Sequence, residues 1–442
     1  MEQNSRKKAK RLGRERFRGK ASCDDSLRFV PIRPTIVGRS HARHPWYISR
    51  MHRRGMRFAV RKRRVLREYM IEPIDIPFFI LLIYRQIERI NRLLGKTFYE
   101  LPSICFLGPL GIGKSKMVYI AAEIIARLKG KRLVILHKLL RDCRTESKLM
   151  ERIREILRNP DKYYIFVDLR LTTVEPYDLQ GILRLVKDDR NDLLVSRNIP
   201  PYWAHLLRVC EGMLFLDEIT QICREDVESA SYMIVLDRRI GELGLHPKTL
   251  IVAAGNLRGQ TRIARNLDPG LANRFIIFYV RKPNAKNFLE YLDQKLRGRV
   301  REYVEHHVLE KLKFVITNDS SRNTGVDPCI RAFVEKYGVY GKYSLDGKTN
   351  FATPRTIERL NILIKGIRDP ETVKRIAFGL LGIRARLFMS IWQGKDKEAE
   401  EDMEEILKDP VSYVKNNTEQ LPKVIDVVTD RLYKVFYSVG SK

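Results

Sequence analysis

The chain has 442 residues, with 84 Lys+Arg against 53 Asp+Glu and a formal net charge of +31. This length suits two or three domains, and the charge favours polyanions such as DNA, RNA or an anionic membrane face. The strongest apolar run, Ile74–Tyr84, has about eleven residues where a membrane span needs about twenty, and no apolar region follows the basic N-terminus as in a secretory signal. The six cysteines are scattered, which excludes a zinc knuckle and gives no disulfide signature. We therefore expect a soluble, intracellular, cytoplasmic protein.

Residues 1–70 carry a large share of the charge. They contain 22 Lys+Arg and 5 Asp+Glu, a net charge of +17, and show no sustained hydrophobic period. Such a segment cannot bury enough apolar surface to fold alone. Two interpretations remain open: a solvated tail, or an arm that binds polyanions and uses Trp46, Tyr47 and Phe58 as aromatic anchors.

Residues 71–300 alternate between short apolar runs and helical patterns. Apolar residues recur at helical spacing between Pro77 and Leu94, which predicts an amphipathic helix. Five apolar runs predict strands buried on both faces, and a helical stretch, Lys114–Lys129, follows the first; the runs are Ser103–Leu107, Leu133–Leu136, Tyr164–Leu169, Gly212–Leu216 and Leu250–Ala254. This alternation predicts a doubly wound α/β domain with a parallel sheet.

The remainder of the chain has a different character. Helical patterns without convincing strands begin at Phe288, and they predict a helical domain over residues 301–395. Residues 317–350 are rich in Asn, Asp, Gly and Ser, which predicts a loop or a small insertion. Residues 396–442 begin with a charged helical pattern, which is typical of a surface helix or tail.

A glycine-rich segment lies between the first predicted strand and the helix that follows it. We call it the glycine loop: Gly108-Pro109-Leu110-Gly111-Ile112-Gly113-Lys114-Ser115. It matches the phosphate-binding pattern G-x4-G-K-[S/T], in which glycines let backbone N–H groups turn toward phosphates and the helix N-terminus adds its positive dipole. In this pattern Lys114 reaches the β- and γ-phosphates of ATP, and Ser115 binds Mg²⁺.

Two adjacent acids, Asp217 and Glu218, end the apolar run that begins at Gly212. Acids at the tip of a buried strand need a cation or a polar task, because an unpaired buried charge is costly. We expect Asp217 to complete the Mg²⁺ shell through water, and Glu218 to polarise the water that attacks ATP.

Taken together, these motifs resemble the AAA+ superfamily of ATPases and, within it, the MoxR-like branch. Three further strings carry this resemblance over roughly residues 70–370: Leu250–Asn256, Leu267–Phe275 and Phe351–Arg355. The resemblance implies that Asn256 contacts the attacking water or the γ-phosphate, as sensor 1 does. It likewise implies that Arg274 is an arginine finger, and that Arg355 is the sensor 2 arginine, with Arg359 as the rival.

The resemblance also implies an architecture and an activity. The expected architecture is a P-loop α/β core followed by a helical lid, in a homo-oligomeric ring of most often six subunits with ATP at the subunit interfaces. The expected function is a remodelling ATPase that acts on a protein partner. The alternative is a nucleic-acid motor or loader anchored by the basic arm. A nucleotide-binding module with little turnover is disfavoured, because it needs neither Glu218 nor Arg274. The segment 180–199 carries both signs of charge and no aromatic residue, so it does not separate the two main hypotheses.

Overall fold

The computed structural model describes residues 68–95, 101–188, 193–316, 325–340 and 350–394. Expectations about residues 1–67, most of the basic arm, and about the charged tail from residue 395 lie outside these ranges. Among the described residues, no helix combines the length and the apolar character that crossing a membrane requires.

A six-stranded sheet forms the centre of the α/β part, with the strand order β10-β1-β9-β6-β3-β2 and parallel pairing between all neighbours. Its strands are β1 (Ser103–Leu107), β2 (Arg132–Ile135), β3 (Tyr163–Arg170), β6 (Gly212–Asp217), β9 (Leu250–Gly255) and β10 (Phe275–Tyr279). The parallel α/β fold and all five predicted strands are confirmed. The sixth strand, β10, was not predicted, although its run of apolar residues carries the same signal.

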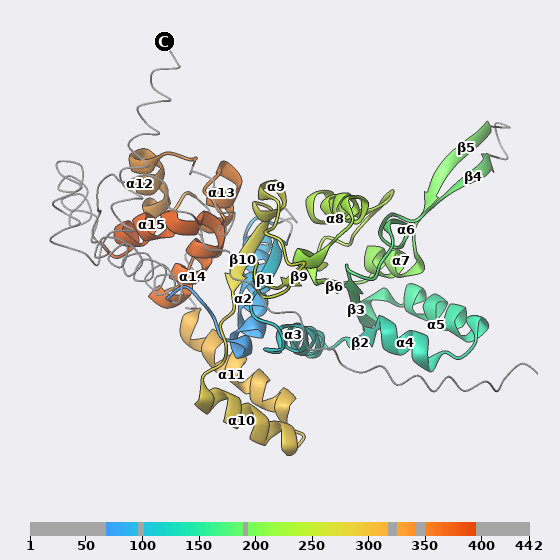
Figure 1. The fold of residues 1–442 in the computed structure, drawn as a ribbon, viewed down its shortest axis with the longest axis horizontal. Helices are drawn as coiled ribbons and strands as arrows, with labels where there is room; N and C mark the ends of the chain where they lie inside the picture. Colours follow the sequence, from blue (N-terminus) through green and yellow to red (C-terminus); the bar gives the residue numbers. More distant parts are fainter. Residues whose placement is uncertain (1–67, 96–100, 189–192, 317–324, 341–349, 395–442) are drawn as a thin grey trace, which may run out of the picture. The chain divides into compact units, whose positions relative to one another are not determined.

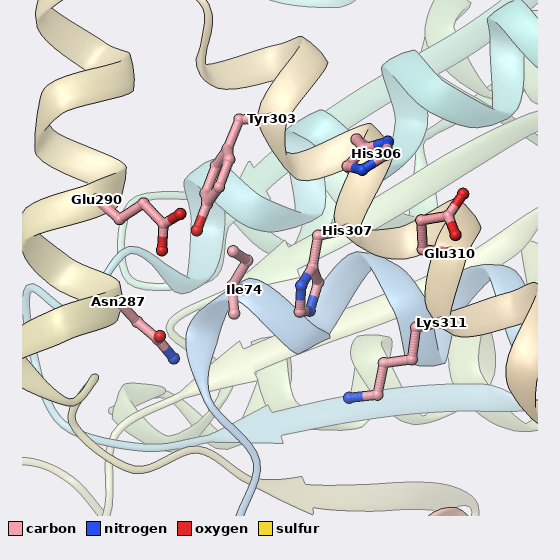
Figure 2. Close-up of a pocket in the computed structure, with 8 residues that line it drawn as sticks. All are labelled: Ile74, Asn287, Glu290, Tyr303, His306, His307, Glu310 and Lys311. Carbon is pink, nitrogen blue, oxygen red and sulfur yellow. The ribbon is translucent and has the colours of Figure 1, made fainter.

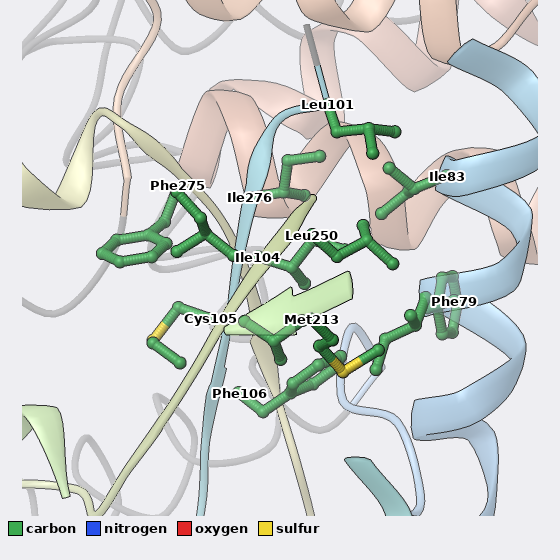
Figure 3. Close-up of a cluster of buried hydrophobic side chains, with 14 of the residues drawn as sticks. Phe79, Ile83, Leu101, Ile104, Cys105, Phe106, Met213, Leu250, Phe275 and Ile276 are labelled. Atoms are coloured by element: carbon green, nitrogen blue, oxygen red, sulfur yellow. The ribbon is translucent and has the colours of Figure 1, made fainter. Parts of the chain in front are cut away.

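The core lies between this sheet and the helices that cover it. The predicted first helix is confirmed as α2 (Ile76–Leu93), and its buried face meets β10 through Phe79. Figure 3 shows Phe79 and Ile83 projecting from α2 toward the strands. The Phe79 and Phe278 rings lie 4.5 Å apart between centroids, and Phe278 stacks on Phe106 at 5.7 Å. Buried aromatic pairs of this kind add to the stabilisation that burial alone provides.

The other elements of the α/β part are helices, 3-10 turns and a small two-stranded ladder. The helices are α3 (Lys114–Leu128), α4 (Leu136–Asp142), α5 (Glu146–Arg158), α6 (Pro176–Gln180), α7 (Tyr202–Val209), α8 (Glu225–Asp237) and α9 (Pro269–Ala272). The 3-10 turns are η1 (Pro73–Asp75), η2 (Pro160–Lys162) and η3 (Ile219–Gln221), and a small ladder joins β7 (Arg239–Ile240) to β8 (Leu243–Gly244).

A β-hairpin occupies the region that sequence analysis left undecided. Its strands β4 (Ile182–Asp188) and β5 (Leu193–Ile199) pair only with each other, in antiparallel register. Figure 1 shows the hairpin extending away from the sheet, beyond α6 and α7. Its aliphatic side chains are therefore exposed, with Leu183, Leu185 and Leu194 between 64% and 67% accessible.

Helices make up the described chain after β10. They are α10 (Ala285–Leu296), α11 (Val300–Val315), α12 (Pro328–Tyr337), α13 (Pro354–Leu363), α14 (Pro370–Leu381) and α15 (Ala385–Trp392), with the 3-10 turn η4 (Gly382–Arg384). Helix α14 packs closely on β10, since a side chain at Gly379 would meet the Ile277 carbonyl oxygen at 2.9 Å. This contact joins the helical part to the edge strand of the sheet.

The prediction of a loop or small insertion over residues 317–350 is wrong for part of that range, because α12 lies within it. The Asp327 side chain caps the helix by accepting a hydrogen bond from Cys329 N, and Pro328 occupies its first turn. Ile330, Phe333 and Tyr337 recur at helical spacing and are buried. This apolar face outweighs the polar composition of the surrounding segment.

Candidate active site

The glycine loop joins β1 to α3, so the strand–loop–helix context that its sequence predicts is confirmed. A side chain at Gly108 would meet Val280 O at 2.6 Å, so no larger residue fits there. Gly111 and Gly113 have φ angles of 69° and 94°, in the left-handed region that favours glycine. The residues between the three glycines are partly or fully exposed, at Pro109, Leu110 and Ile112. The loop thus has glycine where its backbone requires it and an accessible rim.

Lys114 is buried at the base of the loop. Its ammonium donates hydrogen bonds to Gly108 O at 2.8 Å, to Pro109 O at 2.7 Å and to Asn256 Oδ1 at 3.1 Å. Burial lowers the pKa of Lys114 to about 8, against the opposing influence of the acidic groups of Asp217 and Cys105. The side chain therefore holds a positive charge inside the loop and links the loop to the end of β9.

Ser115 and Asp217 bring the start of α3 to the end of β6. Ser115 Oγ donates a hydrogen bond to Asp217 Oδ2 at 2.7 Å, and Asp217 Oδ1 accepts one from Glu218 N at 2.9 Å. Carboxyl ends of parallel strands meet at one edge of a sheet, which is where such sheets bind ligands. One hydroxyl and one carboxylate beside a phosphate loop fit Mg²⁺, which takes few protein ligands together with phosphate oxygens and water.

Glu218 follows directly and has an unusual backbone. Its φ angle of 62° is left-handed, and among the described residues only Arg238 shares this feature without being glycine. Such conformations cost about 1–3 kcal/mol and cluster at functional sites. The Glu218 carboxylate accepts a hydrogen bond from the Thr172 hydroxyl, just after β3. Sequence analysis did not identify Thr172, because an isolated threonine after a strand gives no specific signal.

Asn256 lies at the end of β9, where its backbone is fixed by Thr220. Asn256 N donates to Thr220 Oγ1 at 2.8 Å, and this hydroxyl donates to Asn256 O at 2.9 Å. Both residues are buried. Thr220 also fills the space beside Gly255, where a β-carbon would meet Thr220 Cγ2 at 2.7 Å. The Asn256 side chain is thereby held against Lys114, and sequence analysis did not identify the threonine that holds it.

The predicted arginines lie together rather than at the glycine loop. No hydrogen bond or ion pair between described residues joins Arg274 or Arg355 to Gly108–Ser115. Arg359 Nη1 instead donates to Arg274 O at 2.6 Å. Burial, followed by the charge of Arg355, lowers the pKa of both Arg274 and Arg359, and for Arg359 the charge of Arg274 adds to this, lowering the value to about 10. We call these three residues the arginine cluster.

The two candidates for the sensor 2 position, Arg355 and Arg359, differ in how accessible their guanidinium groups are. Arg355 is exposed in the first turn of α13, whereas Arg359 is partly buried and its guanidinium is engaged with the Arg274 carbonyl. An arginine already bound to a backbone carbonyl is less available to a phosphate than an exposed one. The arrangement therefore favours Arg355 over Arg359.

A separate cavity of about 460 Å³ is lined by residues of η1, α10 and α11, and it shares no residue with the glycine loop. Figure 2 shows Glu290 of α10 and Tyr303 of α11 pointing toward each other across it. On its wall, His307 and Lys311 contact Asp75 at 3.2 and 2.6 Å. The Asp75 pKa is held well below its ordinary value by these partners, which outweigh its burial. These charges tie η1 to α11, which indicates a structural role.

Comparison with known proteins gives little further guidance. No family model matches the chain, and no curated protein matches it. Similar solved structures include a protein of Cytophaga hutchinsonii described as a candidate ATPase, with 16% identity, a TM-score of 0.37 and coverage of 78% of this chain and 98% of that one. Another is PCH-2 of C. elegans, with 14% identity, a TM-score of 0.25 and coverage of 74% and 68%.

Proposed function

We propose that the chain is an AAA+ ATPase of the MoxR-like type, which hydrolyses ATP at the glycine loop. The observation that carries this proposal is the convergence of motifs from three strands. Lys114 contacts Asn256 at 3.1 Å, and Ser115 contacts Asp217 at 2.7 Å. These residues are up to 142 positions apart in the sequence. A short motif can match by chance, but a chance match would not bring such distant residues together at one edge of the sheet.

Each residue at this edge has a chemical task in the proposed reaction. The backbone N–H groups of the glycine loop and the Lys114 ammonium bind the β- and γ-phosphates of ATP. Ser115 and Asp217 would hold Mg²⁺, which neutralises charge on the phosphate oxygens. Glu218 accepts the proton of the attacking water, and Asn256 orients that water or the γ-phosphate.

The arginine cluster supplies the remaining positive charge. We propose that Arg274 and Arg355 reach ATP across a subunit interface, in a homo-oligomeric ring of most often six copies. Two observations support this placement. Arg274 precedes β10 and the glycine loop follows the parallel strand β1, so the two lie at opposite ends of neighbouring strands. Arg355 also lies close enough to Arg274 for its charge to lower the Arg274 pKa. An arginine supplied in this way accelerates phosphoryl transfer by about 10³–10⁵. In this proposal residues 71–300 are the ATPase core, and residues 301–395 are a lid that moves against it.

The variant Glu218→Gln tests the catalytic assignment. It keeps the size of the side chain and removes its basicity, so ATP binding should stay within about twofold while phosphate release falls at least about 100-fold. Glu225→Gln is a matched control, because Glu225 is an exposed acid in the first turn of α8. Normal turnover in Glu218→Gln would show that another group activates the water.

The hairpin β4–β5 favours a protein as the partner of the ATPase. Its exposed aliphatic side chains suit an extended apolar polypeptide better than a sugar–phosphate backbone. The opposing observation is the net charge of +17 on residues 1–70, which favours DNA or RNA. The motor or loader thus remains the second candidate function, resting on the basic arm.

Phosphate release separates these two partners. It should be measured with reduced casein as an extended protein probe, and with double-stranded DNA, single-stranded DNA and RNA over a salt series. Stimulation by casein that is lost in the double variant Leu185→Asp/Leu194→Asp supports the protein remodeller. Stimulation by a nucleic acid that fades steeply with salt supports the motor and overturns the first choice.

A further inference from the structure

A buried polar network joins the turn that carries Arg274 to the start of α13. Asn273 Nδ2 donates to Asn350 Oδ1 at 3.3 Å and to Phe351 O at 3.1 Å, and Asn273 Oδ1 accepts from Thr353 Oγ1 at 3.0 Å. Asn273 is only 6% exposed. Its amide therefore connects the end of α9 to residues that lie close to 80 positions later in the chain.

Asn350 is the centre of this network. It is 2% exposed, and its Nδ2 donates to Phe275 O at 2.9 Å and to Gly379 O at 3.0 Å. Its Oδ1 accepts from Asn273 Nδ2 and from Phe351 N at 3.0 Å. All four hydrogen bonds of one side-chain amide are thus made. A buried amide satisfied in this way holds its neighbours in one geometry, since every alternative leaves a polar group unpaired.

The Arg274 backbone lies in the middle of these contacts. The preceding Asn273 is held by its side chain, the following Phe275 by its carbonyl, and Arg274 O accepts from Arg359 of α13. The guanidinium of Arg274 takes no part in these bonds. The network therefore fixes where this side chain starts while it leaves the charged group free for a ligand.

The same contacts hold Arg355 close to Arg274. Thr353 caps α13 and bonds to Asn273, and Arg355 lies in the first turn that follows. Arg274 is partly buried and Arg355 beside it is exposed. Their like charges repel each other, and an anion between them removes the repulsion. The start of α13 adds the positive end of its dipole to the same place.

We propose that Asn350 is a positioning residue, which holds the Arg274 turn against the start of α13 so that Arg274 and Arg355 reach one phosphate group of the neighbouring subunit's ATP together. This inference rests on the proposed function and adds to it. Because Asn350 bonds both to Phe275 of β10 and to Gly379 of α14, it keeps the two arginines in a fixed position relative to each other. A displacement of about 1 Å at a reacting centre costs about 100-fold in rate.

Mixed rings test the proposal. Asn350→Ala alone should bind ATP within about twofold of the unmodified protein and release phosphate at least about 10-fold more slowly. Mixed with Lys114→Ala subunits, which cannot bind ATP, it should recover at least about fivefold in phosphate release. The reason is that Lys114→Ala subunits present intact arginines to the ATP of Asn350→Ala subunits.

Two further mixtures separate the possible failures. Glu218→Gln mixed with Lys114→Ala should stay inactive, because Glu218 serves the ATP of its own subunit. Arg274→Ala mixed with Lys114→Ala should recover if Arg274 acts across the interface. Recovery of Arg274→Ala without recovery of Asn350→Ala overturns the role of Asn350 and leaves the proposed function standing. Absence of recovery in both overturns the interface placement, and the inference with it.

A purely structural role gives a different result. If the network only stabilises the fold, Asn350→Ala loses ATP binding in its own loop, and mixing does not rescue it. Where Asn350→Ala fails to fold, Arg359→Gln takes its place in the same mixtures, because it removes the bond to the Arg274 carbonyl from a less buried position.

Discussion

Replacement of the buried Lys114 by Met should change how the free energy of unfolding depends on pH. The pKa of Lys114 is about 8 in the folded chain and about 10.5 for a free lysine. Between these values the unfolded chain binds more protons, so the free energy of unfolding rises with pH and the cost of burying the charge is fully present below pH 8. A shift of this size corresponds to about 3 kcal/mol, and to about 2 kcal/mol once solvent screening is allowed for.

The assay is urea denaturation of both proteins at steps from pH 7 to pH 10.5. Subtracting the free energy of unfolding of the unmodified protein from that of Lys114→Met cancels the contributions of groups that titrate alike in both proteins. The advantage of Lys114→Met should be largest below pH 8 and should shrink by about 2 kcal/mol by pH 10.5. The exposed Lys148→Met serves as the control and should show a flat difference. A flat or rising difference for Lys114→Met would refute the burial of a charged lysine in the glycine loop.

Two further changes have expected results. Gly108→Ala places a β-carbon 2.6 Å from Val280 O, so thermal denaturation should show a loss of about 1–3 kcal/mol in the free energy of unfolding, and ATP binding should fall. In the control Gly244→Ala the β-carbon meets nothing within 4 Å, so stability and ATP binding should both stay unchanged. Deletion of residues 1–60 should leave basal phosphate release within about twofold, because the described site uses no residue from that segment; a large loss of turnover would show that the arm is part of the enzyme.

Much of the α/β part could be predicted because parallel strands buried on both faces need nearly continuous apolar runs. The glycine loop was predictable because its residues are consecutive in the sequence, so the whole motif can be recognised without knowing the fold. Asp217 and Glu218 stand out because two acids end an apolar strand. The structure brings Lys114, Ser115, Asp217 and Asn256 together as the motifs led us to expect.

The rest depends on contacts that no local pattern encodes. The hairpin escapes prediction because its aliphatic residues face solvent, so the usual alternation of buried and exposed positions is absent. Thr172 and Thr220 are single small polar residues whose tasks exist only beside Glu218 and Asn256. Asn350 bonds to a carbonyl 75 positions earlier, and it lies in a stretch whose composition suggested only a loop.

The most direct test of the central claim is phosphate release from ATP with and without free Mg²⁺, in the unmodified protein and in Asp217→Asn. The account predicts turnover that stops when Mg²⁺ is chelated, returns when Mg²⁺ is restored, and falls at least about 100-fold in Asp217→Asn. Asp226→Asn, which weakens an exposed ion pair with Arg224 and keeps an oxygen for the Val227 N–H, should release phosphate normally. Turnover that persists in chelator, or that is equal in Asp217→Asn and the unmodified protein, would contradict hydrolysis at the site formed by the glycine loop and the end of β6.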